Sequence, residues 1–159
     1  MLMVAVDTGL RVSELCNLRL KDLNEDGSIT VHQGKGAKDR VVFAGHAALD
    51  FLETYINHYR NEPAYRFRSF LWIGHNHAPV RPVAFRKALY YAGDRLGIKV
   101  HPHKLRRTFA TMMLLNKADL FTLQELMGHN DIATTRKYIP RDIERLREVH
   151  RSASPGDML

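Results

Sequence analysis

The hydrophobic pattern changes its period once along the chain, and this change restricts the fold class. Residues 25–43 read EDGSITVHQGKGAKDRVVF, where Ile29 and Val31 alternate with polar residues and Val41 and Phe43 follow a glycine-rich turn. Alternation at every second residue on both sides of such a turn predicts a β-hairpin with a basic tip. Apolar residues elsewhere recur at helical spacing. The sequence therefore predicts an α+β fold that is mainly helical, with a small antiparallel hairpin near the N-terminal side.

Helices are expected on both sides of the hairpin. MLMVAVDTGL reads as a helix end broken by Gly9, and Ser13 can cap a helix in RVSELCNLRL. SFLWIG is a short apolar segment that resembles a strand. Tyr55, Tyr59, Tyr90 and Tyr91 are expected on apolar helical stripes. Further helices are predicted in HAALDFLETYINHYRN, RPVAFRKALYYAGDRLGI, HPHKLRRTFATMMLLNKA from about His103, DLFTLQELMGH, DIATTRKY and RDIERLREVHR.

Composition narrows the function classes. A chain of 159 residues fits one domain with a real core. It contains no apolar run near 18 residues and no signal peptide, so we expect no membrane association. Its single cysteine, Cys16, excludes an internal disulfide framework and fits the reducing cytoplasm. A formal net charge of +7 favours a polyanionic partner such as nucleic acid, although a basic protein can also have no such partner.

Basic residues at two turns are candidate phosphate ligands. Arg11 follows Gly9 at a predicted helix start, where free backbone N–H groups and a guanidinium suit an anion. Lys35 and Lys38 lie at the predicted hairpin tip, from which a mobile ammonium can reach DNA. The alternative for all of them is an ordinary solvated surface side chain.

The segment HKLRR places two further candidates on one predicted helix. His103 and Arg106 are three residues apart, so they share a helix face and could hold a phosphate together. His101, His103 and His129 match no strong zinc signature, since neither a cysteine nor a carboxylate completes the set. We therefore expect no metal and no cofactor.

The segment GHNDIATTRKYIP surrounds a tyrosine with basic and polar groups. His129 precedes Tyr138 by nine residues, and Pro140 ends the predicted helix just after it. This placement favours an exposed phenol over a core aromatic ring, although the residue type alone does not decide between them. Together with the arginines, lysine and histidines above, a phenol supplies the groups that a metal-free phosphoryl transfer needs.

Motifs along nearly the whole chain resemble the catalytic domain of tyrosine recombinases, the phage-integrase family that includes the Xer resolvases. TGLRVSEL, GKGAKDR, HKLRRTFAT, LMGH and TTRKY occur in the family's order between about Thr8 and Tyr138. One position differs: Arg107 stands where the family often has histidine, which affects only local packing. The resemblance implies catalytic roles for Arg11, Lys35, His103, Arg106, His129 and Tyr138.

The resemblance also implies partners and boundaries. We expect residues 1–140 to form the catalytic domain and residues 141–159 a tail helix with a frayed end, the family's N-terminal core-binding domain being absent. Duplex DNA is the expected partner, on which copies of the chain assemble as a tetramer, with a monomer or weak dimer in its absence. Expected phosphate contacts are Lys38, Arg40, Arg81, Arg86, Lys87, Lys104, Arg107, Arg136 and Lys137. Alternatives are a DNA-relaxing enzyme of the type IB topoisomerase kind and a non-catalytic DNA-binding remnant.

Overall fold

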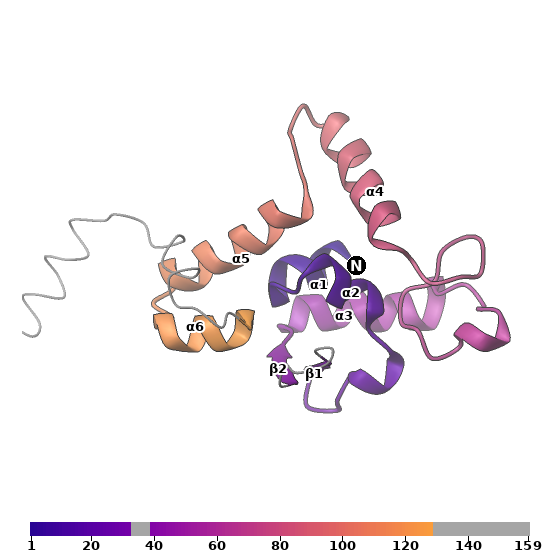
Figure 1. Ribbon diagram of the computed structural model, residues 1–159, viewed down its shortest axis with the longest axis horizontal. Helices are drawn as coiled ribbons and strands as arrows, with labels where there is room; N and C mark the ends of the chain where they lie inside the picture. Colours follow the sequence, from indigo (N-terminus) through magenta and orange to yellow (C-terminus); the bar gives the residue numbers. More distant parts are fainter. Residues whose placement is uncertain (33–38, 129–159) are drawn as a thin grey trace, which may run out of the picture.

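The structure is a computed structural model in which residues 1–32 and 39–128 are described. A two-stranded antiparallel sheet and the short helices α1 to α3 lie at the centre of the molecule, and α5 and α6 lie together at one end (Figure 1). The predicted α+β fold is confirmed. The main elements are α1 (Leu2–Thr8), α2 (Val12–Asn17), β1 (Ser28–Val31), β2 (Arg40–Phe43), α3 (His46–Thr54), α4 (Pro82–Asp94), α5 (Pro102–Leu115) and α6 (Leu120–Met127).

The hairpin register decides which side chains reach the core. Ile29 pairs with Val42 across the sheet, and both are buried together with Val31. Because side chains alternate between faces along a strand, Val41 and Phe43 point outward and are 45% and 61% exposed. One face of the sheet therefore closes the main core, and the other exposes Val41 and Phe43 to solvent.

The main core joins the first two helices, the sheet and parts of α3, α4 and the SFLWIG segment. That segment is not a regular strand: Phe70 makes a single bridge with Arg19, and Ile73 makes one with Pro79. Its burial nevertheless follows its apolar character, since Leu71 and Trp72 are almost fully enclosed. The main core consists of Val4, Ala5, Leu10, Leu15, Cys16, Leu18, Ile29, Val31, Val42, Leu52, Leu71, Trp72, Phe85, Leu89 and Leu105.

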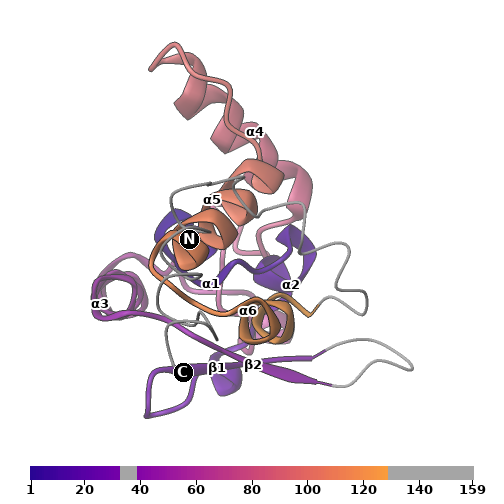
Figure 2. The same ribbon diagram turned by 90° about the vertical axis from the view of Figure 1, so that its left-hand side faces the viewer.

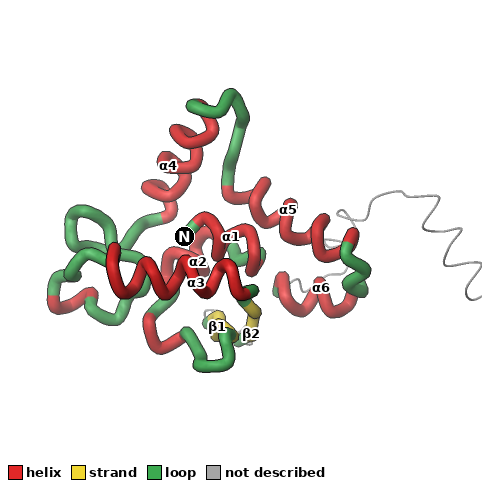
Figure 3. Tube along the Cα trace, turned by 180° about the vertical axis from the view of Figure 1, so that it is seen from behind, coloured by secondary structure: helices red, strands yellow, loops and turns green. Residues whose placement is uncertain are grey.

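A second, smaller apolar cluster lies between α5 and α6. Phe109, Ala110 and Leu114 of α5 pack with Leu123 and Met127 of α6. Figure 3 shows these helices as an antiparallel pair beside the central body. Leu105, one turn earlier on α5, belongs to the main core, so this helix spans both clusters.

Helix α4 extends away from the body, and this explains an error in the sequence prediction (Figures 1 and 2). Only Phe85, Leu89 and Gly93 of α4 are buried. Tyr90 and Tyr91 are each 64% exposed, so the prediction that they lie on an apolar packing stripe is wrong. The same prediction is wrong for Tyr59, which is 71% exposed at the end of the π-helix Tyr55–Tyr59. Tyr55 fits the prediction better, because its ring lies 4.9 Å from that of Trp72 and its hydroxyl accepts a hydrogen bond from the Ile73 N–H. No helix among the described residues is long and apolar enough to cross a membrane.

Candidate active site

Arg11 stands at the start of α2, as the sequence predicts, whereas the prediction that Ser13 caps this helix is wrong because Ser13 lies inside it. Gly9 ends α1 in the left-handed conformation with φ of 62°, and Arg11 is the N-cap of the next helix. Glu14 fixes its position: the Arg11 backbone N–H donates to Oε2 at 2.8 Å and Nη1 donates to Oε1 at 2.9 Å. Nη2 donates to the Gly128 carbonyl at the far end of α6. The Arg11 side chain remains 42% exposed, so it is oriented and still accessible.

Arg106 is buried, and backbone carbonyls bind its guanidinium. It is 5% exposed, although it carries a charge that is rarely buried without partners. Its Nη1 donates to the Gly9 carbonyl at 2.5 Å and its Nη2 donates to the Met127 carbonyl at 2.6 Å. These acceptors lie two residues before Arg11 and one residue before Gly128. Arg11 and Arg106, the two arginines predicted to hold a phosphate, therefore both lie beside residues 9–11 and both bind the end of α6 at residues 127–128.

His103 lies one turn before Arg106 but in a different environment. It is exposed, whereas Arg106 is buried, because α5 enters the core only from Leu105 onward. Helix α5 begins at Pro102 with His101 as its N-cap, whose ring accepts from the Lys104 N–H at 3.2 Å. His103 lines an open cavity of about 660 Å³ together with His101, Lys104, Arg107, Thr108, Thr111 and Met112. Two histidines, two cations and two hydroxyls contribute to the wall of this cavity.

The C-terminal end of α6 is the meeting point of the arginines. Arg40 donates to the carbonyl of Leu126, Arg106 to that of Met127 and Arg11 to that of Gly128. Carbonyls in the last turn of a helix lack intrahelical donors and carry the negative end of the helix dipole. Gly128 completes the arrangement with φ of 61°, which directs the chain away from the helix axis. Three guanidiniums thus fix the point from which the chain continues to His129.

Glu14 is a site residue that the sequence reasoning missed. Its carboxylate receives Arg11 on one side and, on the other, Arg40 through Nη1 at 3.0 Å and Nη2 at 2.8 Å. Burial raises the pKa of Glu14, but hydrogen bonds from Arg40 and from the Arg11 backbone, with the charge of Arg40, outweigh it and lower the pKa to about 2. Its position in the sequence could have indicated this role: Glu14 lies three residues after Arg11, in the first turn of a helix, where a carboxylate is favourable.

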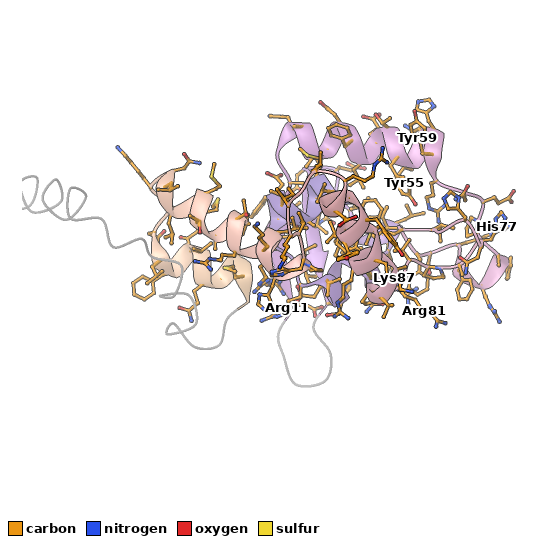
Figure 4. The ribbon with its side chains drawn as sticks, turned by 90° about the horizontal axis from the view of Figure 1, so that it is seen from above. Arg11, Tyr55, Tyr59, His77, Arg81 and Lys87 are labelled. Carbon is orange, nitrogen blue, oxygen red and sulfur yellow. The ribbon has the colours of Figure 1, made fainter. Side chains whose placement is uncertain are left out.

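Arg40 has a different environment from the one expected of a phosphate contact. Its side chain is only 9% exposed, and its guanidinium is bound to Glu14 and Leu126. Other predicted contacts lie on the surface: Lys104 and Arg107 on α5, and Arg81 at the start of α4. Viewed from above, Arg11, Lys87 and Arg81 lie along one side of the molecule, and Tyr59 lies on the opposite side (Figure 4).

Gly9 determines how closely α5 approaches Arg11. A Cβ atom at Gly9 would lie 2.2 Å from the Phe109 ring, and its φ of 62° already disfavours side chains. Phe109 lies one turn after Arg106 on α5. The glycine therefore permits the close approach that lets its own carbonyl accept the Arg106 guanidinium.

Several predicted site residues lie outside the described ranges, namely Lys35, Lys38, His129, Arg136, Lys137 and Tyr138. Their predicted roles remain predictions. Within residues 1–32 and 39–128, no group of three or more His, Cys, Asp or Glu side chains is placed to hold a metal ion. Cys16 is buried, and burial raises the pKa of its thiol to about 11.

A family model described as the phage integrase family matches residues 1–145. The chain belongs to the phage integrase family. Among curated relatives, tyrosine recombinase XerC of Halalkalibacterium halodurans is 37% identical over 155 residues, which cover 93% of this chain and 51% of that protein. Tyrosine recombinase XerA of Pyrococcus furiosus is 38% identical over 143 residues, covering 89% of this chain and 49% of that protein. This phage integrase family member thus spans about half the length of the relatives it matches.

Solved structures agree with this family membership. The crystal structure of XerA recombinase matches with a TM-score of 0.80 and 32% identity, covering 96% of this chain and 56% of that one. XerH site-specific recombinase bound to its difH substrate matches with a TM-score of 0.76 and 27% identity, covering 93% and 44%. The Tn1549 transposon integrase in complex with a circular intermediate DNA, at 21% identity, has a TM-score of 0.85 over 96% of this chain and 57% of that one, and shares the fold.

Proposed function

We propose that this chain is the catalytic domain of a site-specific DNA recombinase that cleaves and rejoins DNA through a 3′-phosphotyrosyl intermediate. The observation that carries the proposal is the convergence of Arg11 and Arg106, from helices 95 positions apart, on the Met127 and Gly128 carbonyls. His129 comes next in the sequence, and Tyr138 follows nine residues later. Membership of the phage integrase family supports the same conclusion.

The two arginines address the main obstacle to the reaction, which is the negative charge of the phosphodiester. The accessible Arg11 guanidinium makes charge-assisted hydrogen bonds to non-bridging phosphate oxygens, and the positive charges of both arginines stabilise the extra charge of the transition state. Arg11 is the more accessible of the pair, and Arg106 adds a buried positive charge beside it. Because their positions are fixed before DNA binds, little reorganisation is needed when the phosphate arrives.

The remaining groups carry the proton transfers and the bond exchange. His103, exposed at the start of α5, accepts the phenol proton of Tyr138, since the free ring nitrogen of a neutral imidazole is a proton acceptor. Tyr138 attacks phosphorus, and Lys35 protonates the departing 5′ oxygen. His129 donates a further hydrogen bond to the phosphate. The covalent bond to tyrosine conserves the bond energy, so a 5′-hydroxyl can reverse the step without ATP or a metal.

Surface cations hold the duplex around this centre. Lys104 and Arg107 on α5 and Arg81 at the start of α4 contact DNA phosphates, which position the protein without reading sequence. On DNA, copies of the chain act as a tetramer, so that strands from two duplexes are exchanged. A DNA substrate and a single reduced cysteine both fit the cytoplasm, which we infer is where the protein works.

The proposal is tested by trapping the covalent intermediate. Short nicked duplexes with a randomised core are incubated with the protein, and denaturing electrophoresis then detects a protein–DNA adduct. Tyr138→Phe is the matched control, because it removes one oxygen atom and should give no adduct.

Three other outcomes count against the proposal. An adduct that persists in Tyr138→Phe means that another group is the nucleophile. Relaxation of supercoiled DNA without exchange between two sites indicates a topoisomerase. DNA binding without an adduct on any duplex of the pool indicates a non-catalytic remnant.

A further inference from the structure

Arg40 connects three parts of the molecule through one nearly buried guanidinium. Nη1 and Nη2 each donate to a carboxylate oxygen of Glu14, at 3.0 and 2.8 Å. Nε donates to the Leu126 carbonyl at 2.9 Å. Glu14 lies 26 residues before Arg40 and Leu126 lies 86 residues after it. With its side chain 9% exposed, Arg40 has little surface left for a DNA phosphate.

Each end of this connection leads to a predicted catalytic group. Glu14 holds Arg11 by its backbone N–H and by its guanidinium. Leu126 belongs to the last turn of α6, where the next two carbonyls accept Arg106 and Arg11 and the chain continues to His129. Arg40 itself begins β2 and follows Lys35 by five residues in the sequence.

We propose that Arg40 is a positioning residue for DNA cleavage, which ties the hairpin to the carboxylate that orients Arg11 and to the end of α6. It acts through these groups and does not touch DNA. The role rests on the recombinase function proposed above. The charge of Arg40 alone predicts a phosphate contact. The positioning role replaces that prediction.

Arginine is required for this task, and lysine cannot replace it. The planar guanidinium offers several donors in fixed directions, so it can bind both Glu14 oxygens and the Leu126 carbonyl at once. An ammonium group is a compact point charge on a flexible stem and cannot span the two acceptors in the same way. At a phosphate contact, by contrast, lysine serves well as a point charge. Arg40→Lys therefore separates the two roles.

The experiment compares cleavage and binding in the same chain. Arg40→Lys is prepared with two comparison variants. Arg107→Gln reports the behaviour of an exposed phosphate contact, and Arg66→Lys repeats the same substitution on an exposed arginine of the short 3-10 helix Tyr65–Phe67. The probe is a nicked duplex recovered from the wild-type adduct. The adduct rate is measured at saturating DNA, and the dissociation constant is measured across a range of salt concentrations.

We expect Arg40→Lys to lower the saturating adduct rate between about tenfold and 100-fold, because small displacements of reacting groups have effects of this size. Its dissociation constant and salt dependence should match the wild type. Arg107→Gln should instead weaken binding and reduce the slope of log K against log salt by about 0.9. Arg66→Lys should change neither quantity.

Two results overturn the positioning role. One is an Arg40→Lys variant that forms the adduct as fast as the wild type. The other is a neutral variant, Arg40→Gln, whose only defects are weaker binding and a reduced salt slope, since these mark a phosphate contact. Failure of the wild type to form any adduct counts instead against the recombinase function, on which this role depends.

A second variant keeps the test decisive if Arg40→Lys does not fold. Glu14→Gln keeps the shape of the side chain and removes its charge, so it should also slow the adduct at unchanged DNA affinity. Where all variants fold, the effects of Glu14→Gln and Arg40→Lys should be strongly non-additive, because both break one connection. The proposal is contradicted if Glu14→Gln forms the adduct at the wild-type rate, or if the effects of the two substitutions on the adduct rate simply add. A general loss of stability would predict neither the unchanged DNA affinity nor the non-additive effects.

Discussion

The main core and the α5–α6 end of the molecule are held together by different forces. The main core is a continuous set of apolar side chains that includes Leu15, Leu71 and Trp72. The α5–α6 cluster is small, and the end of α6 is joined to the body by guanidinium–carbonyl hydrogen bonds from Arg11 and Arg40, while Arg106 of α5 donates to both Gly9 and Met127. Two of these arginines, Arg11 and Arg106, are also the predicted catalytic phosphate ligands. Stability and catalysis are therefore separable in the first region and coupled in the second.

The largest effect is expected in the main core. Trp72→Ala should lower the free energy of unfolding by about 3–5 kcal/mol, because a large buried ring is replaced by a cavity. Denaturant unfolding followed by far-UV circular dichroism measures this. Trp72→Phe is the matched control: the indole Nε1 has no hydrogen-bond partner among the described residues, so Phe removes an unpaired donor and should cost much less. Equal losses in both variants would contradict this view of the core.

The contact between Gly9 and Phe109 lies where the main core meets the α5–α6 end, so it tests how tightly the two regions pack. Gly9→Ala should cost about 3 kcal/mol, since it combines a positive φ with a Cβ placed 2.2 Å from the Phe109 ring. Gly97→Ala, with a similar φ of 67° and no atom within 4 Å, should cost only the backbone strain of about 1 kcal/mol. Thermal or denaturant unfolding gives both values. If they are equal, the close approach of α5 contributes nothing to stability.

A cavity in the α5–α6 cluster should unfold that part of the molecule locally. Leu123→Ala should cost about 2–3 kcal/mol, at the low end for a buried leucine because a small cluster can collapse around the gap. Amide hydrogen exchange should show loss of protection in α6 while β1 and β2 retain theirs. Loss of protection in both regions to the same extent would mean that the molecule has one cooperative core.

Acid should weaken the polar connection before it affects the apolar core. The pKa of Glu14 is lowered to about 2 from an ordinary 4.5, so its ionised form stabilises the folded state. That contribution is present above pH 4.5 and is lost as the pH falls toward 2, by about 3 kcal/mol at most. In Glu14→Gln, the free energy of unfolding should depend less on pH between pH 4.5 and 2 than it does in the wild type. An unchanged pH dependence in that variant would assign the acid sensitivity to other carboxylates.

Local sequence rules account for much of the fold. The alternation around Ile29 and the Gly9 break placed the hairpin and the start of α2 correctly, because period and turn chemistry are properties of neighbouring residues. The same rules failed for Tyr90 and Tyr91, since a helical stripe becomes buried only where another element covers it. Helix α4 leaves the body after its first turns, and no local pattern records that departure.

The sequence by itself determined which chemical groups the chain carries and the order in which they occur. Arg11 at a helix start and Arg106 three residues after His103 could both be read from it. Only the tertiary structure decided that Arg106 is buried, that Arg40 pairs with Glu14 and that three guanidiniums meet the carbonyls of residues 126–128. The physical reason is distance along the chain: these partners are 21 to 117 residues apart, beyond the reach of any helical or strand period. Packing brings them together, and burial then makes the hydrogen bonds of Arg40 and Arg106 necessary.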